Sequence, residues 1–333
     1  MKTPICLAAS ASCTLLFTLG CGPDAGMIDP ATHRDGVATS LASARYSDWS
    51  VPVPLGPVNS EFTDQQPALS KDGLSLYFAS SRPTDPSDNV LDQNIWVAQR
   101  PCTDTDDEEC AWSAPVALGP AVNGPSLEAS PSLSRDEHQL FLSSQRPNDH
   151  CSVAPCDRDL WVSYRDDMHD DLGWQAAVTL PGAVNSVAEE VAPSYFENAD
   201  ASVPQLFFNR GAVGGEIYVS EMKDGTWGVP ALVDALNISS TNQRPSISHD
   251  GLEIYFWSDR DGIGHLWVAR RQTVSSSWST PVRAVFPTSD QQPAIMPFIH
   301  SRGKTETLLF VRPFGLAARD LWITERTRLG RLE

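Results

Sequence analysis

Sustained helical periodicity is absent from this sequence of 333 residues outside its first 21 positions. Positive charge is also scarce, because 24 Lys and Arg stand against 42 Asp and Glu, and the formal net charge is −18. The missing helical period favours an all-β chain. An acidic surface disfavours nucleic acid and anionic lipid headgroups as partners, so we expect no binding to nucleic acid.

Recognised catalytic motifs are also missing. The chain has no Ser-His-Asp signature, no phosphate-binding glycine loop and no metalloprotease helix. Five histidines are scattered over tether, turns and loops, and we expect them to be solvated rather than catalytic: His33, His138, His169, His249 and His300. These absences favour a non-catalytic protein.

Cysteine is sparse, at seven residues, and its distribution fits an exported protein. Beyond residue 21 four remain, an even number for a compartment that permits disulfides: Cys102, Cys110, Cys151 and Cys156. Four cysteines allow three connectivities. Local pairing of 102 with 110 and of 151 with 156 is favoured, because the strand order proposed below puts the two pairs on opposite faces of the domain. His150 also permits a zinc interpretation, but no second pair of metal ligands lies nearby, and we predict no metal there.

The first 21 residues have the features of a secretory signal. Lys2 precedes an uncharged, mostly apolar core from 5 to 19, which ends in a four-residue segment, 18–21, that resembles a bacterial lipobox. We expect Cys21 to carry lipid and to anchor an exported protein in the periplasm or at the cell surface. An ordinary secreted protein is the alternative. Residues 22–47 are small and polar, as in a flexible tether.

One phrase recurs five times along the rest of the chain. Its fullest form begins Trp-x-x-Pro-Val, and the tryptophans of successive copies are 51 to 63 residues apart. These tryptophans are Trp49, Trp112, Trp174, Trp227 and Trp278. A repeat of this length is typical of propellers, solenoids and other arrays. A single copy cannot bury both faces of a small sheet, so the copies must pack on one another.

Each copy divides into four short segments with strand composition. The first contains proline and ends at an Asp-Gly turn, as in 66–73; the second and third are rich in aromatic and β-branched residues, as in 76–78 and 95–97; the fourth is the tryptophan phrase. Five four-stranded antiparallel sheets around one axis make a five-bladed β-propeller over residues 48–326, followed by a tail, 327–333.

The order of segments at the two ends predicts how the ring closes. The chain begins with a fourth-strand segment, 49–55, and its last copy stops after a third strand, 320–325. Pairing of these two segments completes the fifth blade and removes an exposed sheet edge. We therefore expect the N-terminal strand to pair with the C-terminal blade.

The repeats resemble a known family. Ser-Lys-Asp-Gly-Leu-Ser-Leu-Tyr-Phe-Ala-Ser-Ser-Arg (70–82) and its counterpart at 248–260 are similar to the WD40-like (PD40) repeat of the TolB propeller. The tryptophan phrase resembles the version found in bacterial envelope proteins that also carry OmpA-like domains. The resemblance covers all five copies and implies an envelope propeller. The chain contains no OmpA-like segment, so peptidoglycan binding is not implied.

Polar residues recur in columns that the strand order places on one face, where the loops from fourth to first and from second to third strands lie. One column, three residues before the strand-one proline, holds Asp64, Glu128, Glu190, Asn242 and Asp290; another, after strand two, holds Arg82, Arg146, Arg210, Arg260 and Arg312; a third opens strand three with Asn94, Asp159, Glu216, His265 and Asp320; Asn59, Asn123, Asn185 and Asn237 belong to the same face. Five copies in register favour a structural role for the arginines, as clamps on neighbouring acids.

The first column is also a candidate ligand site, because we expect its side chains to point towards the axis. Long polar side chains break the repeat on adjacent blades at 65–66, 243–244 and 291–292. We therefore predict a ligand site at the channel mouth formed by Asp64, Gln66, Glu128, Glu190, Asn242, Arg244, Asp290 and Gln292. Bound calcium is a weaker alternative to compensation of the acids by arginine, and we predict no cofactor.

We interpret the chain as a monomeric, lipid-anchored propeller that binds an envelope protein or glycan without catalysis. One alternative is a carbohydrate-active enzyme that uses the channel-mouth carboxylates, because some glycosidases are five-bladed propellers. The equivalent repeat positions of these acids argue against it, since a catalytic pair needs different surroundings. Another alternative is a purely structural subunit of an envelope assembly.

Overall fold

The computed structural model describes residues 46–84, 92–104, 107–153, 156–197, 203–211, 215–238, 241–287, 293–314 and 318–329. The expected signal, Cys21 and most of the tether lie outside these residues, as do Asp290 and Gln292. No helix in the described part is long and apolar enough to cross a membrane.

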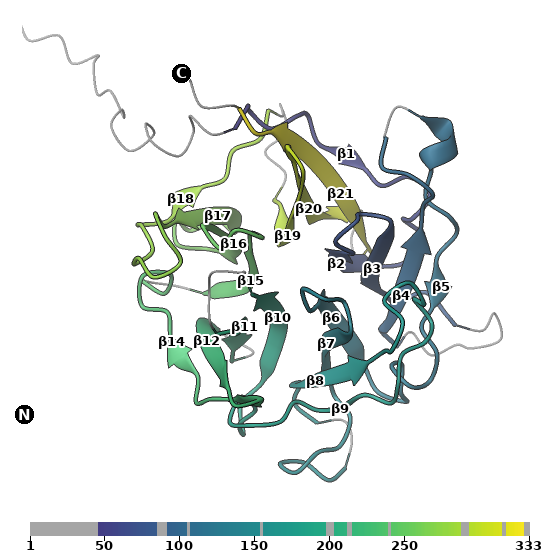
Figure 1. Ribbon diagram of the computed structural model, residues 1–333, viewed down its shortest axis with the longest axis vertical. Helices are drawn as coiled ribbons and strands as arrows, with labels where there is room; N and C mark the ends of the chain where they lie inside the picture. Colours follow the sequence, from purple (N-terminus) through teal and green to yellow (C-terminus); the bar gives the residue numbers. More distant parts are fainter. Residues whose placement is uncertain are drawn as a thin grey trace, which may run out of the picture. The chain divides into compact units, whose positions relative to one another are not determined.

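The described chain is an all-β propeller of five antiparallel blades, as predicted (Figure 1). Blade 1 contains β2 (Asp64–Leu69), β3 (Ser75–Ser80), β4 (Asn94–Gln99) and β5 (Val116–Ala117). Blade 2 contains β6 (Glu128–Leu133), β7 (Gln139–Ser144), β8 (Asp159–Tyr164) and β9 (Val178–Thr179). Blade 3 contains β10 (Glu190–Phe196), β11 (Gln205–Arg210), β12 (Glu216–Lys223), β13 (Thr226–Trp227) and β14 (Ala231–Leu232). Blade 4 contains β15 (Asn242–Ile247), β16 (Glu253–Ser258), β17 (His265–Arg270) and β18 (Val282–Arg283). Blade 5 contains β19 (Ile295–Arg302), β20 (Thr305–Phe314), β21 (Ala318–Thr327) and β1 (Val53–Pro54).

The N-terminal strand closes the ring, as the order of segments predicted. β1 pairs antiparallel with β21, with Val53 opposite Ile323. Backbone hydrogen bonds extend this pairing on both sides, from Ser50 N to Glu325 O at 2.7 Å and from Leu55 N to Leu321 O at 2.9 Å. The fifth blade therefore has no unpaired outer edge at β21.

The first strand of each blade lies nearest the axis, and each one packs against the first strands of the neighbouring blades (Figure 1). The second and third strands are almost wholly apolar where they face the next blade, which gives a continuous series of buried clusters between blades. Most of the largest fully buried side chains come from second strands, including Tyr77, Phe141 and Tyr255. Burial of this apolar surface is the main favourable term that holds blade to blade.

The repeated tryptophans pack inside the domain rather than forming long outer strands. The fourth strands are only two residues long and start after the tryptophan. Trp49 lies edge-on to Tyr255, with ring centroids 6.3 Å apart, and the Arg326 guanidinium lies 4.5 Å from its ring centroid. Arginines lie over the equivalent tryptophans of three other blades: Arg100 over Trp112, Arg165 over Trp174 and Arg271 over Trp278. The tryptophan repeat is thus explained by packing.

Candidate functional site at the channel mouth

The arginine that follows each second strand forms a clamp within its own blade. Arg82 Nη2 donates to Asp64 Oδ1 at 2.6 Å and to the Val58 carbonyl at 2.7 Å. The same pairing recurs in three further blades: Arg146 with Glu128 at 2.9 Å, Arg210 with Glu190 at 2.6 Å and Arg260 with Asn242 at 2.6 Å. The partner is therefore the residue that opens strand one, and not the acid that opens strand three or one in another blade.

The described acids of the first column are buried inside their blades, whereas the sequence analysis expected them to point towards the axis. Asp64, Glu128 and Glu190 have no exposed surface. Each accepts hydrogen bonds from the loop before its strand, as in the bond from Ser60 N to Asp64 Oδ2 at 2.7 Å. Asn242 is equally buried. These four predicted site residues fasten each incoming loop to its blade, because a short carboxylate or amide at this position meets both the arginine and the loop.

The asparagine column has an equally local explanation. Asn123 accepts from Ile95 N at 2.8 Å and donates to Ile95 O at 2.9 Å. Asn59, Asn185 and Asn237 make the corresponding pair of bonds to the start of a third strand. A side-chain amide at this point extends the short fourth strand by one backbone-like pair of bonds.

A bulge in each first strand turns a different set of residues towards the axis. The register shifts at the residue before the proline, where the backbone is left-handed, with φ between 54° and 58°: Gln66, Ser130, Ala192, Arg244 and Met296. These five residues and their prolines line a narrow axial cavity of about 40 Å³. A non-glycine residue in this conformation is strained by roughly 1–2 kcal/mol, and the strain recurs in all five blades.

Two of the predicted site residues, Gln66 and Arg244, do lie at this axis. The Gln66 carbonyl accepts from Ser130 N at 3.2 Å, and its Nε2 is buried without a hydrogen-bond partner. Arg244 is partly buried, and its Nη1 is shut off from solvent and also lacks a partner. Because the axial cavity is so small, it cannot hold a sugar ring.

Three arginines from three blades meet at the loop face of this channel. Arg158 and Arg319 occupy the same repeat position, which lies one residue before β8 in blade 2 and is the second residue of β21 in blade 5. The other blades have Gln93, Gly215 and Gly264 at this position. Burial, and then repulsion from Arg158 and Arg319, lower the pKa of Arg244 to about 9. Arg319 donates to Gln65 Oε1 at 2.5 Å, so its partner is a neutral amide. These positions break the fivefold pattern.

Two carboxylates beside this arginine cluster have different surroundings. Glu189 is ion-paired, since it accepts from Arg158 Nε at 2.5 Å, and its Oε2 is buried without a partner. Burial, and then the adjoining carboxyl of Glu190, raise the pKa of Asp159 to about 7. Asn148 donates to Asp159 Oδ2. The junction of blades 2 and 3 therefore holds one carboxyl with a strongly raised pKa and one that is ion-paired with an arginine.

The opposite end of the channel is lined differently. A cavity of about 110 Å³ there is bordered by Lys71, Arg135, Glu137, His249 and His300. Burial lowers the pKa of His300 to about 4, and the neighbouring His249 contributes to this shift. His300 is therefore neutral at physiological pH, and its Nε2 is buried without a partner. His300, expected to be solvated, is instead half-buried at this end, whereas His249 is exposed, as expected.

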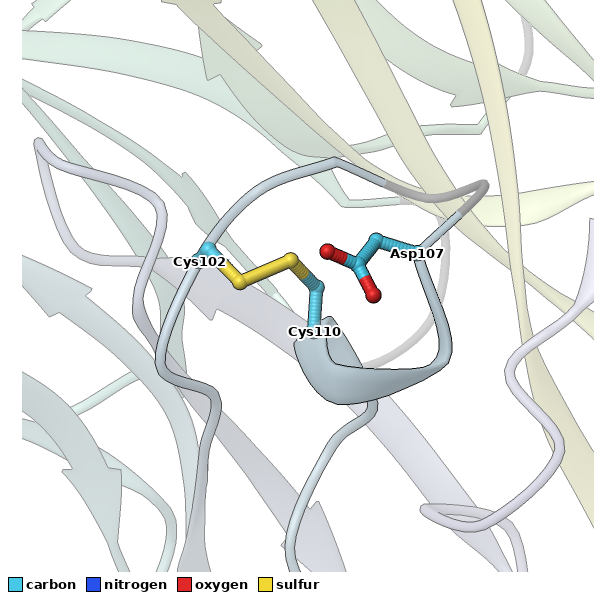
Figure 2. A group of neighbouring side chains, drawn as sticks. All are labelled: Cys102, Asp107 and Cys110. Atoms are coloured by element: carbon cyan, nitrogen blue, oxygen red, sulfur yellow. A yellow bond between two sulfur atoms is a disulfide. The ribbon is translucent and has the colours of Figure 1, made fainter.

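Both predicted disulfides are present, Cys102–Cys110 and Cys151–Cys156, with Cα atoms 4.8 Å and 5.8 Å apart. Figure 2 shows Asp107 beside the first of them. These three side chains lie close enough to suit a metal ion, but the two sulfurs are bonded to each other and are not thiolate ligands. The Asp107 carboxylate instead caps the 3₁₀ turn Glu108–Cys110 by accepting from Glu109 N at 2.9 Å.

The fold is shared with solved structures of low sequence identity. The catalytic domain of an alpha-L-arabinofuranosidase from Coprinopsis cinerea matches at 13% identity with a TM-score of 0.57, over 85% of this chain and 98% of that one. An endo-arabinase from Bacteroides thetaiotaomicron matches at 14% identity with a TM-score of 0.51, over 84% and 98%. A putative TolB from Agrobacterium tumefaciens matches at 13% identity, over 86% and 99%, with a TM-score of only 0.44.

No family model matches this sequence, and no curated protein matches it. The similar structures therefore define a class, the five-bladed propellers, and the resemblance to PD40 repeats is supported only to that level. Glycoside hydrolases of this fold match better than TolB does. The expectation that the chain is not an enzyme is overturned by this finding. Its main argument, the equivalence of the first-column acids, also fails, because those acids are buried clamps.

The carboxylates with unequal surroundings were not among the predicted site residues. Arg158, Glu189 and Arg319 had no place in any repeated column, and Asp159 was included only as a member of the third column. The sequence does contain a signal: Arg-Asp precedes or opens strand three at 158–159 and 319–320, but not in the other copies. Comparing the residue types of the five copies at every loop position would have singled out Arg158 and Arg319.

Proposed function

We propose that the chain is a carbohydrate-active enzyme that binds a glycan at the loop face of the channel and cleaves a glycosidic bond there. One observation carries the proposal: two carboxyl groups at the junction of blades 2 and 3 have different surroundings. Asp159, with a pKa of about 7, is suited to donate a proton to the leaving oxygen. Glu189, ion-paired with Arg158, is suited to act as the ionised partner.

Glycoside hydrolysis requires this division of labour. One carboxylic acid protonates the departing oxygen while a second carboxylate activates water or attacks the sugar, and the two groups must be in different environments to hold different protonation states at one pH. Burial beside Glu190 supplies the first environment and the Arg158 guanidinium supplies the second. The shared fold with arabinofuranosidases and an endo-arabinase supports the same reaction class.

The test is release of reducing sugar from a panel of polysaccharides and oligosaccharides. Asp159→Asn and Glu189→Gln should each lower kcat by at least 100-fold, because general acid–base catalysis contributes typically 10²–10⁴-fold. Glu216→Gln is the matched control, since Glu216 opens strand three in blade 3 as Asp159 does in blade 2. Full activity of Asp159→Asn, or no release from any glycan by the wild-type protein, would contradict the proposal.

We further propose that this enzyme is exported and anchored by lipid on Cys21, because the segment 18–21 resembles a lipobox. Metabolic labelling with a radioactive fatty acid should mark the wild-type protein and not Cys21→Ser. An unlabelled wild-type protein that leaves the cell in soluble form would favour the ordinary secreted alternative.

A further inference from the structure

Positive charge at the channel mouth is not matched by negative charge. Arg244 forms no ion pair within the described residues, and Arg319 is bonded only to the neutral amide of Gln65. Glu189, the described acid whose charge acts on Arg244, is already engaged by Arg158. The sequence has 42 acidic residues, and the four clamps show that it can place a partner beside an arginine where stability requires one.

An enclosed guanidinium without a counter-charge is unfavourable for folding. The packing of a blade does not require arginine at the repeat position of Arg158 and Arg319, because three blades have glutamine or glycine there. Arg244 keeps its charge at neutral pH despite the depressed pKa of about 9. Arg244 and Arg319 are thus held near each other although the fold does not require these two cationic side chains.

An anionic group on a ligand is the natural partner for this cluster. A guanidinium presents a planar pair of N–H donors that matches a carboxylate, and the buried Nη1 of Arg244 is an unused donor of this kind. The Gln66 Nε2 is a second unused donor on the same lining. The axial cavity of about 40 Å³ admits one small group and excludes a ring.

We infer that the channel mouth recognises the carboxylate of a uronic acid residue, with Arg244 and Arg319 as its partners, so that the substrate is an acidic glycan. This inference rests on the proposed function and specifies its substrate class. The carboxylate would point into the axial cavity and leave the sugar ring at the mouth, beside Asp159 and Glu189. Specificity would then come from an ion pair that the free protein lacks.

The experiment compares two ligands that differ only in charge. Trigalacturonate and its carboxyl-reduced, neutral counterpart are titrated calorimetrically into the full chain carrying Asp159→Asn, so that hydrolysis does not consume them. We expect the acidic trimer to bind roughly 10- to 100-fold more tightly, as lost hydrogen bonds to a charged group predict. Adding Arg244→Gln or Arg319→Gln should remove most of this preference. Arg302→Gln is the control, because Arg302 is exposed at the turn between β19 and β20 on the opposite face.

Equal affinity for the two trimers, or a preference that survives Arg244→Gln, would overturn the inference. Tighter binding of a sulfated neutral trimer than of trigalacturonate would also overturn it. Hydrolysis of neutral glycans without any charge preference would contradict this inference but not the proposed function. A clear preference for the acidic trimer without hydrolysis by the wild-type protein would support this inference and contradict the proposed function.

A second readout separates a binding role from a structural one. Arg244→Gln removes an unpaired cation, so its melting temperature without ligand should equal or exceed that of the wild-type protein. Arg244→Lys keeps the positive charge but loses the planar pair of N–H donors, and should retain only part of the preference for the acidic trimer. A fall in melting temperature for Arg244→Gln would show that the guanidinium supports the fold, and would contradict the inference.

Discussion

Two sets of arginines lie on the same face of the propeller, and they differ in their partners. The arginines after the second strands occur in every blade, and Arg82, Arg146 and Arg210 each have a fully buried acid within 2.9 Å. Arg158, Arg244 and Arg319 do not follow the fivefold repeat, and among the described residues only the first of them has an acidic partner. Residues that repeat with the blades are satisfied by the blades. Among the residues that break the repeat, Arg244 and Gln66 each have a buried donor without a hydrogen-bond partner.

The comparison requires a closed ring, and breaking the ring should have the largest effect. Deletion of residues up to 55 removes β1 and Trp49, exposes the outer edge of β21 and uncovers apolar surface on blade 5. We expect an insoluble protein or loss of the cooperative thermal transition. The measurement is solubility and circular dichroism on heating, with deletion of residues up to 44 as the control. An unchanged melting temperature would refute closure through this segment.

Substituting one arginine from each set separates them by stability. Arg146→Met leaves Glu128 buried without a cation, and the loss of one partner from a buried pair lowers the free energy of unfolding by about 3–5 kcal/mol. Arg244→Met removes a guanidinium that has no acidic partner among the described residues, and should leave the free energy of unfolding unchanged or slightly higher. Chemical denaturation measures both. Equal losses would show that the two sets do not differ.

The sequence predicted the five blades, the closure and both disulfides because each is fixed by local patterns that recur. A repeated tryptophan, an Asp-Gly turn and an apolar second strand leave few alternatives for packing. The site was harder to predict for a physical reason: the bulge in each first strand turns Gln66 and Arg244 towards the axis and leaves Asp64 and Glu190 buried. Register at a bulge depends on one left-handed residue and is not visible in alternation alone.

The pH dependence should sharpen the difference between Asp159 and the clamped acids. Its pKa is raised to about 7 from an ordinary value near 3.8, so the folded state binds a proton more tightly than the unfolded state. This contribution to stability is fully present below pH about 3.8 and is lost as pH rises through 7. The melting temperature of the wild-type protein should therefore fall, relative to that of Asp159→Asn, between pH 4 and 7.

Hydrolysis should follow the same group. Activity that needs a protonated Asp159 falls as pH rises above about 7, and kcat against pH reports it. A wild-type rate that is constant from pH 6 to 9 would argue against Asp159 as the proton donor.

The smallest effect on ligand binding should come from the disulfide on the face opposite the arginines. Replacing Cys102 and Cys110 by serine opens a short loop and should lower the free energy of unfolding by about 2 kcal/mol. Ligand binding should not change, because this loop joins β4 to β5 at the far end of the blade. Calorimetric titration with the glycan, before and after the substitution, checks this. A tenfold loss of affinity would place the ligand site on the wrong face.

The central claim is that the residues that break the repeat form the ligand site, and a crystal structure of Glu189→Gln soaked with trigalacturonate tests it most directly. The account predicts electron density at the loop face, with a carboxylate within hydrogen-bond distance of Arg244 Nη1 and the next glycosidic oxygen near Asp159. Density in the cavity beside His249 and His300, at the opposite end of the channel, would contradict it.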